Sequence, residues 1–492
     1  MSLIRANGLT FAYPGSYDNV FENVSFQFDT GWKLGFLGRN GRGKTTLLRL
    51  LLGRYPDCGG ISGAPPCAYF PYEAEEPERM TLDVLRGACP AAEEWELLRE
   101  TGLLGVDAGA LYRPFETLSN GERTKCLLAA LFCGEERYLL IDEPTNHLDA
   151  AGRRAAADYL RRKRGFLLVS HDRDFLDGCV DHILALNRTG FEVQSGNFST
   201  WWENKARRDA FEQAKNERLQ KEAGRLRRAA ERTSDWSYKV EAAKTGSRNS
   251  GLRPDRGYIG HKSAKMMQRA KAIDQRRQKA LEEKAGLLKD LEKGEPLKLR
   301  PLTARGRLLE LADVSLFYGE TQVCGPLDLR LEPGERVALN GGNGSGKSTL
   351  LKLLCGETGM TAAGTAARLP GLTVSYVPQD TSRLRGSLRD YARESGVDET
   401  LLLAILRKLD FPRAQFEKDM ADWSAGQKKK ALIARSLCES AHLYIWDEPL
   451  NYIDVWSRMQ IEELLLEFQP AMLFVEHDGA FRRRVATRVV EI

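Results

Sequence analysis

Two short glycine-rich stretches carry the residue types that hold a phosphate chain. GRNGRGKTT covers residues 38–46, GGNGSGKST covers 341–349, and both match the pattern GxxxxGK[ST]. Glycines let backbone N–H groups approach phosphate oxygens closely, and the helix that follows points its positive end at the same anion. Lys44 and Lys347 are expected to reach the β- and γ-phosphates. The two stretches therefore predict two sites for a nucleoside triphosphate.

Two acidic pairs end apolar runs that are typical of buried strands. YLLIDEP contains Asp142 and Glu143, and LYIWDEP contains Asp447 and Glu448. A buried carboxylate is costly unless a cation or donors compensate, so the aspartates are predicted to bind Mg²⁺ directly or through another ligand. The glutamates are predicted to orient and polarise the attacking water, although a strand-capping acidic pair is the alternative. Together with the hydroxyls of the glycine-rich stretches, the metal-binding side chains expected here are Thr45, Asp142, Ser348 and Asp447.

His171 and His477 each follow the acidic pair by about 30 residues, again where an apolar strand is expected to end. A lone histidine is usually structural. The matched spacing instead favours a hydrogen-bond donor that senses the γ-phosphate. We therefore predict that both histidines belong to catalytic sites.

The chain contains an internal repeat. Besides the two glycine-rich stretches, LSNGE recurs as WSAGQ, IDEPTNHLD as WDEPLNYID, and VSHD as VEHD, at offsets of 303, 305, 305 and 306 residues. Four elements in one order at nearly one offset indicate a duplicated domain. Apolar strands with functional residues at their carboxyl ends predict an α/β domain on a parallel sheet in each copy. We expect domains at 1–197 and 301–492, with a linker at 198–300.

Composition sets the broad class of the protein. A chain of 492 residues with 42% apolar and 29% charged residues is expected to be globular and to form two or three domains. It has no apolar run of about 18 residues and no secretory signal pattern, so we expect a cytoplasmic protein. Nine scattered cysteines suggest neither a disulfide framework nor a CxxC metal site.

The basic charge is concentrated in the middle of the chain. Residues 201–300 contain 27 Lys and Arg against 15 Asp and Glu. Two long runs there are free of proline, and Met266, Ile273, Ala280 and Leu287 keep a seven-residue spacing along the second. Such a thin apolar seam suits two helices packed on each other in a hairpin of about 50 to 60 Å. We expect the tip loop near 241–259.

The chemistry of this tip favours contact with folded RNA. Glycines permit close approach, lysines and arginines neutralise phosphates, and aromatic rings stack on bases. A solvated basic linker without a partner is the alternative. The residues predicted to face RNA are Trp236, Lys244, Arg248, Arg253, Arg256, Tyr258, Lys262 and Lys265.

The order of phosphate loop, LSGGQ-like signature, acidic pair and histidine resembles ATP-binding-cassette (ABC) domains in both halves. The resemblance implies two domains that pair head to tail within one chain, each ATP lying between the phosphate loop of one and the signature of the other. It also implies an Mg²⁺-binding role for Gln379 in YVPQD and stacking of adenine on Tyr13 and Tyr318, although either tyrosine could instead belong to the core. The nucleotide-binding residues so implied are Tyr13, Gly38, Asn40, Gly41, Gly43, Lys44, Thr45, Thr46, Ser119, Gly121, Tyr318, Gly341, Asn343, Gly344, Gly346, Lys347, Ser348, Thr349, Ser424 and Gly426.

The sequence departs from the ABC pattern at four positions. Tyr72 stands where the first half should have a glutamine like Gln379. Asn120 and Ala425 replace a signature glycine, and Glu122 replaces a glutamine. We expect both sites to bind ATP with Mg²⁺.

Twin cassettes separated by a charged helical hairpin resemble the ABC-F family, and segments such as WKLGFLGRNGRGKTTLLRLLLG and LYIWDEPLNYIDV resemble its Lsa-type antibiotic-resistance members. This implies an ATPase that enters the E site of the bacterial ribosome, contacts 23S rRNA and P-site tRNA, and protects the peptidyl-transferase centre from lincosamides, pleuromutilins or streptogramin A. A housekeeping translation factor is the nearest alternative. A fused double ATPase of an importer is another, but it requires a membrane subunit, which we do not expect.

Overall fold

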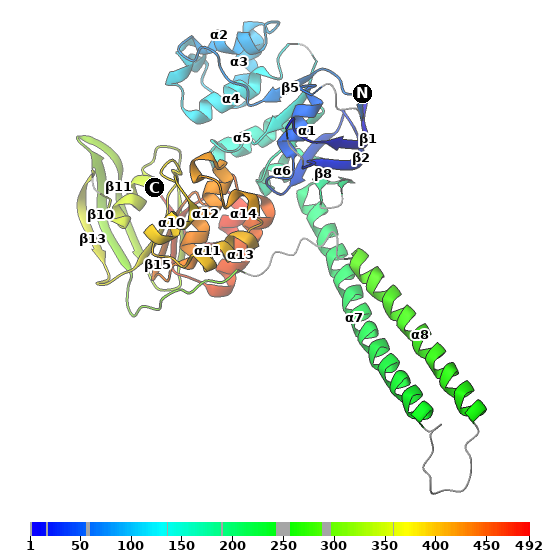
Figure 1. The fold of residues 1–492 in the computed structure, drawn as a ribbon. Coiled ribbons are helices and arrows are strands. Elements are labelled where there is room, and N and C mark those ends of the chain that lie inside the picture. Colours follow the sequence, from blue (N-terminus) through cyan, green and yellow to red (C-terminus); the bar gives the residue numbers. More distant parts are fainter. Residues whose placement is uncertain are drawn as a thin grey trace. The chain divides into compact units, whose positions relative to one another are not determined.

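Two α/β halves and a pair of long helices form the part of the chain that the structure describes (Figure 1). This computed structural model describes residues 2–15, 18–55, 60–134, 136–187, 190–242, 256–287, 297–357 and 359–492. One unit of the fold contains both halves of the repeat, and a second consists mainly of residues 200–293. We call residues 2–197 the first half and residues 301–492 the second half.

A six-stranded sheet forms the centre of the first half. Its order is β5-β6-β7-β3-β8-β9, parallel except where β9 pairs antiparallel with β8. A small antiparallel sheet, β2-β1-β4, packs its apolar face on the same core. The strands are β1 (Leu3–Phe11), β2 (Phe21–Asp29), β3 (Lys33–Gly38), β4 (Ile61–Ser62), β5 (Cys67–Phe70), β6 (Tyr138–Asp142), β7 (Phe166–Val169), β8 (His182–Leu186) and β9 (Phe191–Ser195).

Helices of the first half fall into two groups. Three of them, α1 (Lys44–Leu51), α5 (Ala150–Arg161) and α6 (Arg173–Cys179), each follow a strand of the parallel sheet. A separate helical segment contains α2 (Thr81–Ala88), α3 (Glu94–Leu103) and α4 (Asn120–Ala130), with short 3₁₀ turns at Ala108–Tyr112 and Phe115–Thr117. Because parallel strands end on one edge, β3, β6 and β7 deliver their following residues to the same place.

The second half repeats this plan. Its sheets have the orders β14-β15-β16-β12-β17, fully parallel, and β11-β10-β13, antiparallel. The strands are β10 (Leu309–Tyr318), β11 (Thr321–Leu331), β12 (Arg336–Asn340), β13 (Thr361–Arg368), β14 (Val374–Val377), β15 (Leu443–Asp447), β16 (Met472–Val475) and β17 (Arg488–Glu491). The helices are α9 (Lys347–Cys355), α10 (Leu388–Glu394), α11 (Glu399–Lys408), α12 (Ala425–Cys438), α13 (Val455–Phe468) and α14 (Gly479–Val485), with 3₁₀ turns at Arg413–Gln415 and Met420–Asp422.

Buried ion pairs join the two halves. Arg173 of α6 directs its guanidinium at Glu462 of α13, with Nη1 3.2 Å from Oε2, and its Nη2 lies 3.7 Å from Asp478. Glu462 and Asp478 are fully buried. At the edge of this contact, Nη2 of Arg483 donates to Asp174 at 2.7 Å. The first half thus supplies one of the cations that compensate two buried carboxylates of the second half; Arg458 and Arg484 of the second half supply the others.

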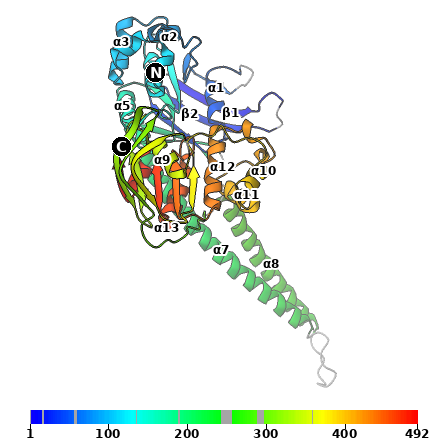
Figure 2. The ribbon, with the colours of Figure 1, turned by 90° about the vertical axis from the view of Figure 1, so that its left-hand side faces the viewer.

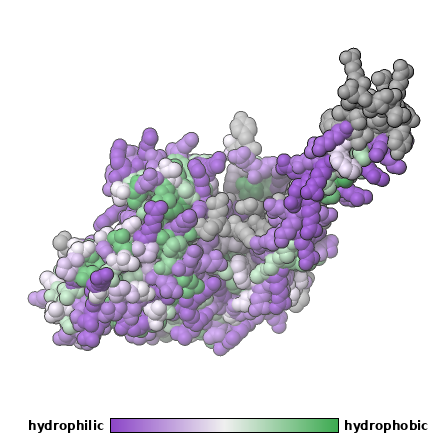
Figure 3. All heavy atoms as spheres, turned by 90° about the horizontal axis from the view of Figure 1, so that it is seen from below, coloured by the Kyte–Doolittle hydropathy of each residue, from purple (hydrophilic) through white to green (hydrophobic). Residues whose placement is uncertain are grey.

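The middle of the chain forms two long helices, α7 (Phe198–Ala242) and α8 (Arg256–Leu287). Figures 1 and 2 show them side by side, running in opposite directions. Leu219, Leu226, Met266 and Ile273, all from the predicted seam, are half-buried. The visible face of the two helices in Figure 3 is mostly hydrophilic, and no helix in the described ranges is long and apolar enough to cross a bilayer.

The helices extend further toward the tip than the sequence suggested. We expected the loop to cover 241–259, but the last turn of α7 includes 241–242 and the first turn of α8 includes 256–259. Residues 243–255 lie outside the described residues.

Replacing Arg173 with Ala tests the contact between the halves. The change leaves Glu462 and Asp478 buried with fewer compensating charges, so we expect the free energy of unfolding to fall by about 3 kcal/mol. Urea unfolding followed by intrinsic tryptophan fluorescence measures this. In a control, Arg389→Ala removes an exposed ion pair with Glu399 within the second half and should leave the unfolding midpoint unchanged. Equal midpoints for Arg173→Ala and the wild-type chain would contradict the interpretation.

Candidate active sites

Each half contributes to both of two pockets at the sheet edges. A cavity of about 820 Å³ combines the phosphate loop of the first half with the signature of the second. A cavity of about 380 Å³ combines the phosphate loop of the second half with the signature of the first. We call them the first and second pockets. Predicted residues that line the first are Tyr13, Asn40, Gly41, Gly43, Lys44, Thr45, Thr46, Asp142, Glu143, His171, Ser424 and Gly426.

The second pocket has the reciprocal composition. Predicted residues that line it are Ser119, Gly121, Asn343, Gly344, Gly346, Lys347, Ser348, Thr349, Gln379, Glu448 and His477. Gly38 and Gly341 contribute instead through their carbonyls, which accept hydrogen bonds from Lys44 and Lys347. The head-to-tail pairing implied by the ABC resemblance is thus the arrangement in which the structure places these residues.

The phosphate loops require glycine for steric reasons. Gly43 and Gly346, which precede α1 and α9, have φ values of 97° and 87°. A Cβ at Gly43 would lie 2.6 Å from Val20, and one at Gly346 would lie 2.6 Å from Cys324. Only glycine combines the left-handed backbone with this close approach. Each loop therefore leads its helix N-terminus toward the pocket, where it can hold an anion.

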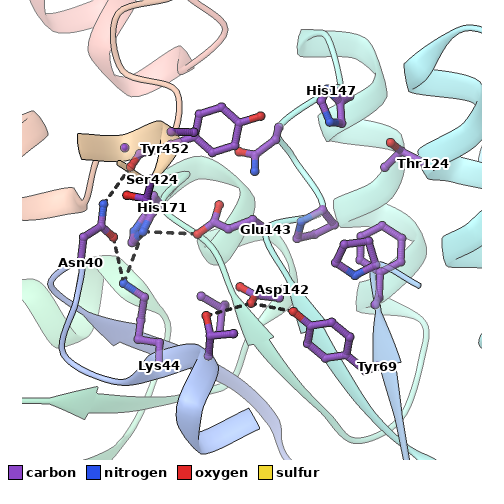
Figure 4. Close-up of a pocket in the computed structure, with 18 of the residues that line it drawn as sticks. Asn40, Lys44, Tyr69, Thr124, Asp142, Glu143, His147, His171, Ser424 and Tyr452 are labelled. Carbon is purple, nitrogen blue, oxygen red and sulfur yellow. Dashed lines mark hydrogen bonds and ion pairs between the residues drawn. The ribbon is translucent and has the colours of Figure 1, made fainter. Parts of the chain in front are cut away.

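Lys44 organises the first pocket (Figure 4). Its Nζ donates to the carbonyl of Gly38 at 2.6 Å and lies 3.3 Å from Oδ1 of Asn40 and 3.5 Å from Nε2 of His171. The same Nε2 lies 3.4 Å from Oε1 of Glu143. Lysine, histidine and glutamate from three separate segments thus converge on one point. This is the arrangement needed to bind a terminal phosphate beside an activating carboxylate.

Burial sets the charge states in the first pocket. Burial, together with the neighbouring Asp142, raises the pKa of Glu143 to about 8. Burial lowers the pKa of His171 well below its usual value, and the nearby Lys44 lowers it further. Burial also lowers the pKa of Lys44, although the nearby carboxylates partly offset this. His171 is therefore neutral at pH 7, with one ring N–H to donate.

The second pocket holds its glutamate differently. Nδ2 of Asn451 donates to Oε2 of Glu448 at 2.6 Å, and Nε2 of His477 lies 3.5 Å from Oε1. Burial acts to raise the pKa of Glu448, but hydrogen bonds with His477 and Gln379 outweigh it and hold the pKa below the usual value. Glu448 is therefore ionised at neutral pH.

Both glutamates occupy a backbone conformation that is unusual for their type. Glu143 has φ of 50° and Glu448 has φ of 45°. A left-handed backbone in a residue other than glycine is strained, and such strain gathers at functional sites. This left-handed conformation occurs at matching positions of the repeat. It therefore supports a functional role for both carboxylates in addition to capping a strand.

The two aspartates offer suitable positions for a divalent cation. Burial raises the pKa of Asp447 to about 6, partly offset by the Ser348 hydroxyl beside it. Both side-chain oxygens of Asp447 are buried, and neither meets the distance and angle of a hydrogen bond with any of the described residues. Asp142 accepts from Tyr69 at 3.0 Å and from Thr45 at 3.4 Å. Hard oxygen ligands beside a phosphate loop fit Mg²⁺.

The two signatures begin helices through the same cap but with different charge. Ser119 caps α4 and pairs with Glu122, while Ser424 caps α12 and pairs with Gln427. The Ser119 hydroxyl donates to Oε2 of Glu122 at 2.7 Å, and hydrogen bonds from Ser119 lower the pKa of that carboxyl. The second pocket therefore carries a fixed negative charge in its signature that the first pocket lacks.

In each pocket an asparagine side chain forms a hydrogen bond between the two halves, with a partner that the sequence did not single out. Nδ2 of Asn40 donates to the carbonyl of Tyr452 at 2.8 Å, and Nδ2 of Asn343 lies 3.3 Å from the carbonyl of His147. Tyr452 and His147 occupy matching positions after the two acidic pairs. Only their matching positions in the repeat could have predicted these contacts. The residue types give no indication, because every residue type has a backbone carbonyl.

The aromatic predictions have different outcomes in the two halves. Tyr13 lines the first pocket and bonds through its hydroxyl to Thr46 at 2.8 Å, whereas Tyr318 is 44% exposed and is not among the residues that line the second. Gln379 lines the second pocket, but the hydroxyl of Tyr72 is buried without a partner among the described residues. The sequence also missed Tyr69, which lines the first pocket and contacts Asp142.

The predicted RNA-facing residues are only partly described. Trp236, on α7, is 65% exposed, and Lys262 and Lys265, on α8, are also exposed. Arg256 and Tyr258 lie in the first turn of α8, where the structure describes the backbone alone. Lys244, Arg248 and Arg253 lie outside the described residues.

Comparison with known proteins decides the family. The family model for the ABC transporter matches residues 21–146 and 324–451, one match in each half. The chain belongs to the ABC transporter family. With two ABC domains joined by a long helical region, it is an ATPase of the ABC-F type, and the predicted α/β fold class is confirmed. ABC domains bind and hydrolyse ATP.

Relatives extend over nearly the whole chain. The ribosome protection protein VmlR of Bacillus subtilis is 28% identical over 487 residues, covering 96% of this chain and 83% of its own. The energy-dependent translational throttle protein EttA of Escherichia coli is 26% identical over 528 residues, covering 96% and 89%. A crystal structure of the archaeal ribosome recycling factor aABCE1 with a stalk protein has the same fold, with a TM-score of 0.62, 18% identity, and coverage of 98% of this chain and 87% of that one.

Replacing Glu122 with Gln tests the charge difference between the pockets. Loss of a negative charge from the signature that contributes to the second pocket should tighten ATP binding there by about three- to tenfold, or about 1 kcal/mol. The reciprocal change, Gln427→Glu, should weaken binding in the first pocket. Equilibrium titration with a fluorescent ATP analogue measures both. Unchanged affinity in both variants would rule out an electrostatic role for this position.

Proposed function

We propose that this ATPase binds the bacterial ribosome and protects it from antibiotics that act at the peptidyl-transferase centre. The observation that carries the proposal is that, along the sequence, a long basic helical hairpin lies between two ATP-binding halves. The resemblance to Lsa-type members and the full-length similarity to a protein named for ribosome protection support it. A ribosomal partner implies a cytoplasmic protein.

The two pockets are proposed to bind ATP with Mg²⁺ and to close around it. Lys44 and Lys347 would contact the β- and γ-phosphates, and Ser119 and Ser424 would add donors from the opposite half. When Mg²⁺ is bound, it neutralises charge on the phosphates. The proposed Mg²⁺ ligands are Thr45 and Asp142 in the first pocket and Ser348, Gln379 and Asp447 in the second.

Within each pocket, the glutamate and histidine are proposed to act on the attacking water and the γ-phosphate. Glu143 and Glu448 would orient the water and accept its proton, and neutral His171 would donate its N–H to a phosphate oxygen. His477 would do the same in the second pocket. ATP then holds the halves together through contacts that ADP, lacking the γ-phosphate, cannot make.

The hairpin is proposed to reach rRNA and P-site tRNA from the E site. Exposed Trp236 supplies a stacking surface, and Lys262 and Lys265 supply charge for phosphates. Lincosamides, pleuromutilins and streptogramin A are the expected targets, on the basis of the Lsa-type resemblance. Inhibitory concentrations of these drugs in a sensitive bacterium that expresses the chain test this directly, and unchanged values for all three classes would remove the resistance function.

A housekeeping translation factor is the second candidate. The similarity to the throttle protein EttA over 96% of the chain favours it, because the ATPase halves would be the same. The two candidates differ at the tip of the hairpin. Unchanged inhibitory concentrations of all three drug classes, combined with ATP-dependent ribosome binding, would support the translation factor.

Replacing both Glu143 and Glu448 with Gln should trap the ATP-bound form on ribosomes. The substitutions remove the proton acceptors but preserve shape and hydrogen bonding, so we expect at least a hundredfold slower turnover with ATP still bound, as for loss of a general base. Co-sedimentation with ribosomes in ATP, compared with ADP, measures the trapping. Normal turnover in the double variant would contradict the assignment of the two glutamates.

Deleting residues 245–257 should abolish protection against the drugs but preserve ATP hydrolysis. The deletion removes basic residues of the tip and leaves both pockets intact, so ATP hydrolysis should stay within about twofold of the wild-type rate. Protection against the three drug classes should be lost. Equal loss of ATPase activity and protection would show that the segment is needed for folding instead.

A further inference from the structure

A small cavity of about 200 Å³ lies next to the second pocket, at the junction of the two halves. Its walls come from α5 and the start of α6 in the first half, and from His477 and α14 in the second. His477 lines both this cavity and the second pocket. Leu148 lines the second pocket and Ala150 lines the cavity, so the two spaces also share one loop. We call it the junction cavity.

The junction cavity carries an excess of positive charge. Four arginines and two aspartates line it. Nη1 of Arg153 donates to Asp172 at 2.8 Å, and Nη2 of Arg483 donates to Asp174 at 2.7 Å. In each of these two pairs, the negative aspartate neutralises the positive arginine.

The remaining arginines make no ion pair among the described residues. Nε of Arg154 donates to the carbonyl of Ala150 at 3.3 Å, and Nη1 of Arg482 donates to Oδ1 of Asn340. Nε of Arg482 is buried without any hydrogen bond in the described part of the chain. A buried donor without a partner is costly, so a small anion in the cavity would satisfy it. Arg154 is exposed and Arg482 is half-buried, and their two positive charges match the charge of hydrogen phosphate.

The repeat supplies an internal comparison. At the positions that correspond to Arg154, Arg482 and Arg483, the other half has Met459, Leu176 and Asp177. Those residues would give the region beside the first pocket no excess of positive charge. The basic character of the junction cavity is therefore a property of the second pocket alone and does not follow from the shared fold.

We propose that the junction cavity binds the inorganic phosphate that hydrolysis in the second pocket releases. The proposal rests on the assignment of the second pocket as an ATP site. No covalent step is added, because phosphate only moves past His477 from one space to the next. A water occupies about 30 Å³, so the cavity holds a phosphate ion with a few waters. Retained phosphate would delay reopening of the halves, because the cavity spans both.

Two measurements of phosphate test the proposal. Quench-flow measures all phosphate formed, and a fluorescent phosphate-binding protein measures free phosphate in the same single turnover. In the wild-type chain, free phosphate should lag behind phosphate formation. In Arg154→Ala, formation should keep its rate, while the lag should shorten at least threefold. Added inorganic phosphate, which tests uptake from solution, should inhibit Arg154→Ala only at concentrations at least tenfold higher than for the wild-type chain.

Matched variants make the outcome specific. Arg161→Ala removes an exposed arginine of the same helix that pairs with Asp158 at 2.8 Å, and it should leave the lag unchanged. Arg482→Lys keeps the positive charge but removes the Nε donor, so its lag should lie between the lags of the wild-type chain and Arg154→Ala. Equal lags in Arg154→Ala and the wild-type chain would overturn the proposal.

The pocket assignment is tested separately. Lys347→Ala should remove the lag by preventing ATP binding in the second pocket, whereas Lys44→Ala should keep it. An unchanged rate and an unchanged lag in Lys347→Ala would refute the second pocket as the source of the phosphate. If instead only the proposal for the junction cavity is wrong, Lys347→Ala will remove the lag but Arg154→Ala will leave it unchanged.

Discussion

The structure depends on the burial of carboxylates in places where water cannot solvate them. Asp447, Glu462 and Asp478 are all fully buried. Each needs a cation or donors, and for Glu462 and Asp478 the other half supplies Arg173. For Asp447 the Ser348 hydroxyl and the nearby Lys429 partly offset the cost of burial. The requirement to neutralise buried carboxylates therefore contributes to the packing of the two halves.

The pockets share a plan but differ in electrostatics. Glu143 has a pKa raised to about 8 by burial and Asp142, whereas donors hold the pKa of Glu448 low. The signature that faces the second pocket carries Glu122, and the junction cavity adds arginines beside it. The second pocket thus combines an ionised glutamate, a negative signature and a basic cavity. A duplicated fold has in this way acquired two sites with different chemistry.

The helical hairpin obeys a different constraint from the halves. Its seam consists of single apolar residues one heptad apart, such as Leu219 and Leu226, with hydrophilic residues on the visible outer face. Such a seam stabilises two helices against each other but leaves no broad apolar surface. Charged side chains remain available for a polyanion, and this separation of the packing face from the charged face suits contact with RNA.

The sequence by itself determined the duplicated α/β fold, the two phosphate loops, the acidic pairs and the two long helices, because glycine spacing and apolar periodicity are local properties. It did not determine that Tyr69 rather than Tyr72 lines the first pocket, that Tyr318 lies away from the second, or where the hairpin helices end. The asparagine bridges to Tyr452 and His147, the Arg173 pairs and the junction cavity were decided only by the tertiary structure. Each joins residues far apart in the chain through distance and burial, and neither quantity is defined until the two halves have packed together.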